Sequence, residues 1–129
     1  MTEPRRLAAV HILTIYSDQI QAHGGSLGLR DRGLLDSVLE RPRNRLRYED
    51  DVDLASLAAA YGFGIAKNHP FFDGNKRVAF QAMYLFLGLN GLRIDATEEH
   101  VVATILALAT GEPDESGLAS WLREHINLR

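Results

Sequence analysis

The chain has 129 residues, an apolar fraction of 46% and a formal net charge of −3, which suits one globular domain, predicted to span residues 1–129. The absence of cysteine excludes disulfides and zinc–thiolate sites. The slightly acidic balance gives no general attraction to nucleic acid, and no apolar stretch approaches the roughly 18 residues that a membrane span needs. We therefore expect a cytoplasmic protein that binds neither membranes nor nucleic acid directly.

Helical periodicity dominates the first half of the chain. Apolar residues at spacings of three and four predict a first helix over about residues 5–23, which the glycines of "HGGSLG" end. Asp31 can cap a short second helix, "RGLLDSVLER", which Pro42 is expected to end. Residues 44–48 alternate weakly and are predicted to form a short extended segment. Asp53 can cap a third helix, "LASLAAAYGFGIAKN", whose small residues suit the centre of a bundle.

The second half continues the helical pattern. A helix that starts near Asn75, "KRVAFQAMYLFLGLN", is apolar nearly all round and is therefore predicted to be buried, with Gly91 ending it. Asp95 and Glu98 stand in capping-box spacing before the next helix. The last helix is predicted over about residues 116–127. The fold class predicted from these patterns is all-α, a compact bundle of about six helices.

The stretch "NHPFFDGNKRVAF", residues 68–80, interrupts the helical pattern. Pro70 disfavours helix at His69, and Gly74 permits a sharp turn before the next helix begins. The first N–H groups of that helix lack partners within the helix and lie at the positive end of its dipole. The turn is therefore predicted to expose an anion-binding site.

Charged side chains around this turn indicate phosphate chemistry. Lys76 and Arg77 add two cations, and Arg77 can hold phosphate oxygens with two hydrogen bonds. Asp73 supplies a carboxylate suited to Mg²⁺, which proteins bind through one or two carboxylates plus phosphates. His69 can accept a proton near neutral pH. A phosphate cradle, a metal ligand and a base together predict phosphoryl or nucleotidyl transfer.

Each of these residues also has a simpler interpretation. Asp73 can cap a helix, His69 can be a structural histidine, and the two cations can belong to a solvated face. Like charges at a helix N-terminus oppose the dipole, however, so structure alone does not favour cations there. One of the phenylalanines, Phe71 or Phe72, is expected to anchor the loop in the core. The combination is more specific than any member, because each residue fills a different role around one helix end.

The segment "HPFFDGNKR" resembles the signature of the Fic/Doc family: a histidine, a phenylalanine two positions later, an acid, a small residue, asparagine, glycine or lysine, and arginine. The chain matches the fixed positions at His69, Phe71, Asp73, Gly74, Asn75 and Arg77. Two more segments, "GGSLGLRDRGLLDSVLERP" and "LFLGLNG", resemble the family's sequence before its substrate-docking flap and after its motif helix. The resemblance covers nearly the whole chain and implies the Fic/Doc fold, with the flap at residues 43–48.

The variable position of the signature separates two branches of the family. Fic adenylyltransferases carry glycine where this chain has Lys76. Lysine there resembles the Doc branch, the toxins of Phd–Doc toxin–antitoxin pairs. That branch implies transfer of the γ-phosphate of ATP to a hydroxyl of elongation factor Tu, which arrests translation. A lysine side chain crowds the adenylyl-transfer pose and favours a reversed nucleotide. Two alternatives stay open: Fic-type AMPylation of a protein hydroxyl, and a non-catalytic binding module.

The resemblance also implies a role for each site residue. The residues implied to be catalytic are His69 as general base, Asp73 as a ligand of Mg²⁺, and Arg77. The residues implied to bind the phosphates of ATP or to line the site are Gly74, Asn75, Lys76, Arg77 and Gln81. The flap at residues 43–48 would pair with an extended segment of the target, although its arginines can equally be solvated charge.

No segment matches the self-inhibitory motif of many Fic proteins, which is Ser or Thr, three residues, Glu, and then Gly or Asn. The nearest match pairs Ser120 with Glu124 but continues with His125, and we interpret it as accidental because it lies in the last core helix. Without such a segment, the resemblance implies a separate antitoxin, the C-terminal part of a small Phd-like protein.

Overall fold

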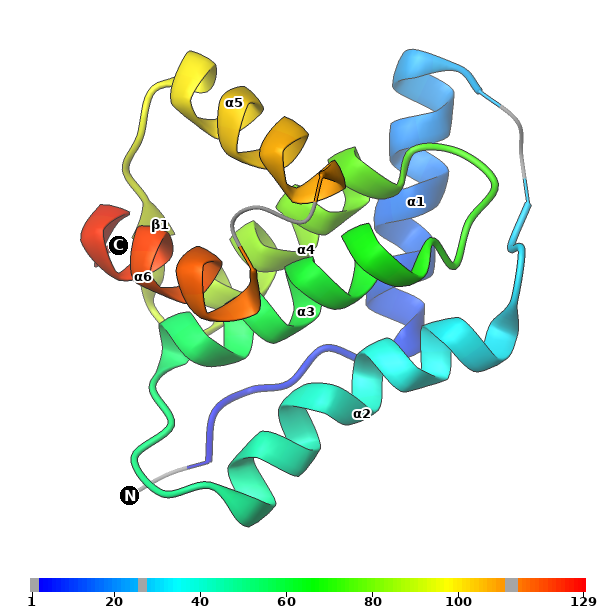
Figure 1. Cartoon of the computed structure of the whole chain (residues 1–129). Helices are drawn as coiled ribbons and strands as arrows, with labels where there is room; N and C mark the ends of the chain where they lie inside the picture. Colours follow the sequence, from blue (N-terminus) through cyan, green and yellow to red (C-terminus); the bar gives the residue numbers. More distant parts are fainter. Residues whose placement is uncertain (1–2, 26–27, 111–113) are drawn as a thin grey trace.

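The computed structural model describes residues 3–25, 28–110 and 114–129. Its elements in chain order are α1 Ala9–His23, α2 Arg32–Tyr48, α3 Leu54–Asn68, α4 Asn75–Leu89, β1 Leu92–Ile94, α5 Glu98–Ala109, α6 Glu115–His125 and β2 Ile126–Leu128. Helices α3 and α4 lie side by side in the middle of the bundle, and α2 lies on the opposite side of α3 from α5 (Figure 1). The predicted all-α bundle is confirmed. Within the described ranges, no helix is both long enough and apolar enough to cross a membrane.

Helix α3 is the centre of the bundle, as its sequence predicts. It packs against α2, α4 and α6, and most of its residues from Ala55 to Ala66 are buried. The small side chains of α3 permit this central position because they let several neighbouring helices approach the axis of α3 closely. The approach is closest at Gly62, where a Cβ atom would overlap the side chain of Met83 in α4.

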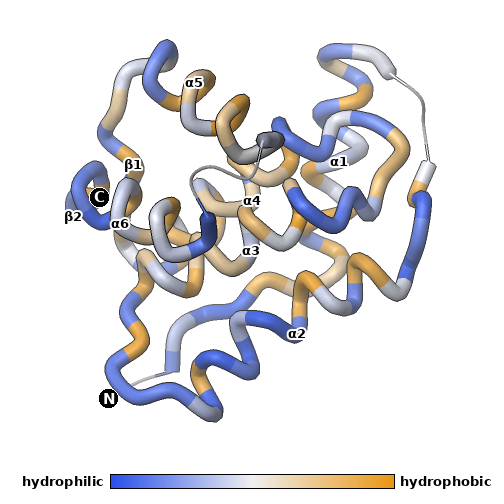
Figure 2. The backbone as a smooth tube through the Cα atoms, in the orientation of Figure 1, coloured by the Kyte–Doolittle hydropathy of each residue, from blue (hydrophilic) through white to orange (hydrophobic). Residues whose placement is uncertain are grey.

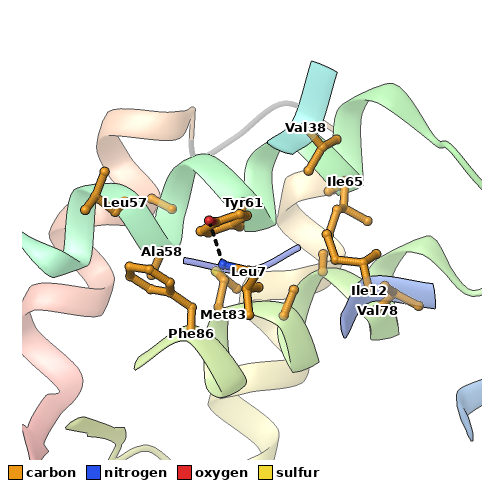
Figure 3. Close-up of a cluster of buried hydrophobic side chains, with 14 of the residues drawn as sticks. Leu7, Ile12, Val38, Leu57, Ala58, Tyr61, Ile65, Val78, Met83 and Phe86 are labelled. Carbon is orange, nitrogen blue, oxygen red and sulfur yellow. Dashed lines mark hydrogen bonds between the residues drawn. The ribbon is translucent and has the colours of Figure 1, made fainter. Parts of the chain in front are cut away.

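The core between α3 and α4 is apolar and contains one tyrosine. Tyr61 of α3 is fully buried, and its ring packs at a tilt against Phe86 of α4 with 5.1 Å between the ring centroids. The N–H of Leu7 donates a hydrogen bond of 3.0 Å to the Tyr61 hydroxyl (Figure 3). This bond satisfies a buried polar group and ties the segment before α1 to the core.

Pro42 does not end α2, and the extended flap predicted at residues 43–48 is wrong. This segment is the last part of α2, whose C-terminal half is mainly hydrophilic (Figure 2). An interior proline costs a helix about 3 kcal/mol because it lacks an N–H group. Here Pro42 is buried, and Arg45 bonds both to Glu49 one turn later, at 3.0 Å, and to Glu115 of α6, at 2.9 Å. Tertiary contacts therefore outweigh the local preference.

A two-stranded antiparallel sheet joins the segments after α4 and α6, and the sequence patterns do not predict it. Leu92 of β1 lies opposite Leu128 of β2. The last helix, α6, therefore ends at His125 and does not continue to about residue 127 as predicted. The predicted cap of α5 is also wrong, because the hydroxyl of Thr97 accepts the first-turn N–H at 3.2 Å. Asp95 instead accepts a hydrogen bond of 2.9 Å from the side chain of Asn127.

The close contact of α3 with α4 predicts that Gly62→Ala lowers the free energy of unfolding by about 1–3 kcal/mol, because the added methyl group displaces Met83. Chemical denaturation measures the change. The matched control is Gly88→Ala in α4, whose Cβ would meet only the flexible end of Arg129, at 3.4 Å. Alanine there is expected to be neutral or stabilising. Equal stability of the two variants would contradict the close helix approach.

A second prediction concerns Asp53, which caps α3 and joins it to α6. Its carboxylate accepts the N–H of Ser56 at 2.8 Å and pairs with Arg123 at 2.7 Å. The hydrogen bond from Arg123 lowers the pKa of the Asp53 carboxyl to about 2. Because this lies below the unfolded value of about 3.9, the stabilisation is complete above about pH 4. It is lost as the pH falls through about 2.

Two substitutions separate the charge of Asp53 from its capping role. Asp53→Asn keeps an acceptor for the cap but removes the charge, so its stability is expected to fall less than that of the wild type between about pH 4 and 2. Asp53→Ala loses the cap as well, at about 1 kcal/mol. Urea denaturation across this pH range measures both, and identical pH profiles for the wild type and Asp53→Asn would rule out the depressed pKa.

Candidate functional site

The turn between α3 and α4 has the form that the sequence predicts. Helix α3 ends before His69, which adopts the left-handed conformation at φ 51° and ψ 60°. Gly74, the N-cap of α4, is also left-handed at φ 79°. A non-glycine residue in this region is uncommon and persists where the surrounding contacts enforce it. The turn lies close to α1 and to the segment that leads into α2 (Figure 1).

Arg30 and Asp31 hold this turn from one side. The guanidinium group of Arg30 donates to the carbonyl oxygens of Asn68, at 2.8 Å, and His69, at 2.7 Å. The N–H groups of Arg30 and Asp31 both donate to the carbonyl oxygen of Pro70, at 2.7 and 3.2 Å. Carbonyl groups at a helix C-terminus have no helical partner, so these bonds satisfy them and fix the backbone that carries His69.

Phe71 anchors the turn in the core, and Phe72 does not. Phe71 is 1% exposed, and its ring stacks on Tyr16 of α1 with 4.0 Å between the centroids. Phe72 is 59% exposed, and its N–H donates to the carbonyl of Gly28 at 3.2 Å. The N–H of Gly28 in turn donates to the Tyr16 hydroxyl. Aromatic stacking and backbone pairing thus hold the two segments together.

Asn75 uses its side chain to hold the loop. Its Oδ1 accepts the N–H of Phe71 at 3.1 Å, and its Nδ2 donates to the carbonyl of Phe71 at 2.9 Å. Nδ2 also lies 3.4 Å from Nδ1 of His69. A contact of that length orients the imidazole ring without fixing which nitrogen carries the proton. The phosphate-binding role predicted for Asn75 can therefore involve only its backbone N–H.

The N-terminus of α4 lacks the side-chain cap that α2, α3 and α6 have, and the N-cap of α1, Ala8, also forms no side-chain cap hydrogen bond. Helices α2, α3 and α6 begin with Asp31, Asp53 and Asp114, and each carboxylate accepts a first-turn N–H. In α4 the N-cap is Gly74, and among the described residues no side chain caps it. Asp73 precedes the N-cap position, which argues against the simpler interpretation of this residue as a cap. The first N–H groups of α4 are thus left for a ligand.

A pocket of about 400 Å³ collects most of the predicted site. Its lining residues are His69, Phe72, Asp73, Gly74, Asn75, Lys76 and Arg77. Gln81 lies outside this pocket and lines a neighbouring groove, which Lys76 and Arg77 also line. Within the described ranges, neither cation forms an ion pair with a carboxylate. Two uncompensated cations beside an uncapped helix N-terminus suit a multiply charged anion.

Glycines let the charged side chains lie close to the backbone here. A Cβ atom at Gly74 would be 3.8 Å from a guanidinium nitrogen of Arg77, so this group lies beside the turn. A Cβ atom at Gly25, in the loop after α1, would be 3.4 Å from a carboxylate oxygen of Asp73. The glycines of that loop were interpreted from the sequence only as a helix stop, although they also make room for the site.

The carboxylate content of the pocket fits a metal ion that arrives with a phosphate ligand. Among the described residues, Asp73 is the one carboxylate that lines the pocket, and these residues contain no group of three or more His, Asp or Glu side chains arranged to hold a metal. Mg²⁺ typically binds through one or two carboxylates and completes its shell with phosphates and water. One carboxylate beside this helix N-terminus is compatible with a Mg²⁺ ion that completes its shell with phosphate oxygens and water.

A second polar pocket, of about 600 Å³, lies between α2, α3 and α6. Arg41 and Arg45 both bond to Glu115, and Arg123 bonds to Asp53. These arginines pair with carboxylates, whereas the cations at the start of α4 have no such pair in the part of the chain that the structure describes. The basic run that was predicted to form a flap therefore joins α2 to α6.

The hydrogen bonds from Arg30 to the carbonyl groups of Asn68 and His69 form a clamp on the turn. They predict that Arg30→Ala lowers the free energy of unfolding by about 1–3 kcal/mol, because two carbonyl groups lose a charged donor. Amide hydrogen exchange is expected to become faster at Phe72 than in the wild type. The control is Arg32→Ala, which removes an exposed pair with Asp36 and is expected to change stability by less than about 1 kcal/mol. Unchanged exchange in Arg30→Ala would show that Arg30 does not hold the turn.

Comparisons with known proteins agree with the architecture of this site. The sequence profile of the Fic/DOC family matches residues 6–87, which include the whole turn. The chain is 33% identical over 119 residues to "Protein kinase doc" of Escherichia phage P1, covering 92% of this chain and 94% of that protein. It is 42% identical over 76 residues to "Toxin Doc" of Mycolicibacterium smegmatis, covering 58% of each. The chain therefore belongs to the Fic/DOC family, and its relatives place it with the Doc proteins.

Proposed function

We propose that this protein is a Doc-like toxin that transfers the γ-phosphate of ATP to a hydroxyl group of a protein, with elongation factor Tu as the target and arrest of translation as the result. One observation carries the proposal: His69 lines the same pocket as the uncapped N-terminus of α4 and two cations that form no ion pair among the described residues. A site that only bound an anion would not need a base beside the phosphate. The names of the relatives, a protein kinase and a toxin, support the same function.

The N-terminus of α4 and its cations bind the phosphate groups in this proposal. The backbone N–H groups of Asn75 and Lys76 donate to phosphate oxygens, and Gly74 lets the ligand approach the backbone. Arg77 stabilises the negative charge that is spread over the transferred group in the transition state. Mg²⁺ held by Asp73 would neutralise further charge on the phosphates when bound.

His69 removes the proton from the attacking hydroxyl group. The hydroxyl oxygen of the target forms a bond to the γ-phosphorus while the bond from that phosphorus to the bridging oxygen breaks. ADP leaves with the electron pair of the broken bond, and the hydroxyl proton passes to the imidazole ring of His69. The left-handed backbone and the Arg30 clamp keep the imidazole at the edge of the pocket.

Lys76 is the residue that favours phosphoryl over adenylyl transfer. Its side chain lies where adenylyltransferases of the family carry glycine, so the two phosphates nearest the ribose cannot rest against bare backbone there. A reversed nucleotide places its γ-phosphate at His69 and its other phosphates near the Lys76 side chain. Lys76 also lines the neighbouring groove, which is consistent with a ligand that extends in that direction.

A Phd-like antitoxin is the partner that this function implies. The segment that comes nearest to a self-inhibitory motif, around Ser120, lies in α6, which packs on α3 through Leu118 and Leu122. This segment contributes to the hydrophobic core and is not positioned to inhibit the site. We therefore propose that a separate protein restrains the toxin.

The proposal predicts the mass of the reaction product. Purified elongation factor Tu incubated with the chain and Mg-ATP is expected to gain one phosphate, measured by intact-protein mass spectrometry. His69→Ala is expected to slow this gain by about 10²- to 10⁴-fold, because the general base is lost. The control is His100→Ala, an exposed histidine of α5, which is expected to act like the wild type.

The same spectrum separates the alternatives. Gain of a whole nucleotide would replace phosphoryl transfer by AMPylation. Equal reaction of His69→Ala and wild type would remove His69 from the mechanism. No gain of mass at all would contradict elongation factor Tu as the target.

A further inference from the structure

A pocket of about 1050 Å³ lies at the end of the bundle away from the turn. Its walls come from residues 3–5, the connection from α2 to α3, the end of α4, and the segments of β1 and β2, which gather at the left of Figure 1. No residue of this pocket lines the phosphate pocket. Six partly buried apolar side chains line it: Leu46, Val52, Leu54, Leu89, Leu92 and Ile126.

Arg5 is held at the edge of this pocket by the side chain of Asn90. Its backbone N–H donates to Oδ1 of Asn90 at 2.9 Å, and Nδ2 of Asn90 donates to its carbonyl oxygen at 3.0 Å. Nδ2 also donates to the carbonyl of Phe86 in α4 at 2.8 Å. The amide of Asn90 thus fixes the backbone of Arg5, 85 residues away in the sequence, to the end of α4.

Arg129 is held at the same helix end. Its backbone N–H donates to the carbonyl of Gly91 at 3.0 Å, and its guanidinium group donates to the carbonyl of Gly88 at 3.2 Å. Both arginines line the pocket. Two guanidinium groups are therefore brought beside one apolar pocket by contacts with a single turn of the chain.

The charges of this pocket favour an anion. In the part of the chain that the structure describes, neither Arg5 nor Arg129 forms an ion pair with a carboxylate. The carboxylate side chains of the described lining are those of Glu3, which is exposed, and Asp53, which pairs with Arg123 at 2.7 Å. An arginine that is fixed at its backbone and has no carboxylate partner can bind a carboxylate with two hydrogen bonds.

We propose that this pocket binds a small amphipathic carboxylate, whose apolar chain lies against the six apolar side chains and whose carboxylate bonds to Arg5 and Arg129. Small-molecule sites combine apolar walls with a few polar groups and hold about 300–1,000 Å³, and this pocket is at the upper end of that range. A protein partner would need a contact of about 800 Å² on each side, whereas these apolar residues are partly buried in a hollow.

The inference does not depend on the proposed phosphoryl transfer. The pocket lies at the C-terminal end of α4, and the phosphate site lies at its N-terminal end, about 20 Å away along the helix axis. The two sites are therefore separate in space and in the residues that form them.

Calorimetry with sodium dodecanoate tests the role of the guanidinium groups. Arg5→Gln is expected to weaken dodecanoate binding by about tenfold, because a charged hydrogen bond to the ligand is lost. The matched control is Arg6→Gln, at the neighbouring exposed arginine that does not line the pocket, and it is expected to bind like the wild type. An equal effect of the two substitutions would overturn the proposal, because the attraction would then be unspecific.

A shorter ligand tests the apolar part of the pocket. Hexanoate has the same head group, and its affinity for the wild type is expected to be lower than that of dodecanoate by more than about tenfold, because fewer methylene groups are buried. Equal affinities would show that the apolar lining takes no part, and this would contradict the proposed site.

Amide NMR spectra recorded during the dodecanoate titration locate the ligand. The largest shifts are expected at Val52, Asn90 and Leu92. Absence of binding, or shifts confined to the start of α4, would overturn the inference and would leave the proposed phosphoryl transfer untouched, since that is measured by the mass of the reaction product.

Discussion

The hydrogen bonds from Arg30 to the end of α3 are the constraint on which the site depends. They hold the carbonyl groups of Asn68 and His69, and the adjacent backbone pairs with Pro70. The buried ring of Phe71 fixes the other side of the turn. Together these contacts maintain the left-handed backbone at His69, which a free chain would rarely adopt. The position of His69 is therefore set by a segment far from it in the sequence.

The same turn leaves α4 with an unsatisfied N-terminus. Glycine at the N-cap gives up the stabilisation that aspartate provides at α2, α3 and α6. Lys76 and Arg77 add charge that opposes the helix dipole. Both features are unfavourable in the free chain, and a phosphate ligand at the start of α4 would relieve both. This local conflict between sequence and stability supports the proposed phosphate site.

Local patterns predict much of this fold, and long-range contacts explain what they miss. The small residues of α3 indicate its central place, and the loop from Pro70 to Gly74 indicates the turn. The prediction that Pro42 ends α2 is wrong because burial of Pro42 and ion pairs with α6 keep α2 helical beyond this residue. The pairing of β1 with β2 and the clamp by Arg30 join segments distant in sequence, so no periodicity reveals them. Most of the predicted site residues share one pocket, but the bonds of the Asn75 side chain to Phe71 follow only from the structure.

The central claim is that the start of α4 is a preformed phosphate site. It is tested most directly by amide NMR spectra recorded while Mg-ATP is titrated into the protein. The largest shifts are predicted at the N–H groups of Gly74, Asn75 and Lys76, with smaller changes around the ion-paired arginines of α2. Shifts that centre on Arg41 and Arg45 and leave the start of α4 unchanged would contradict the account.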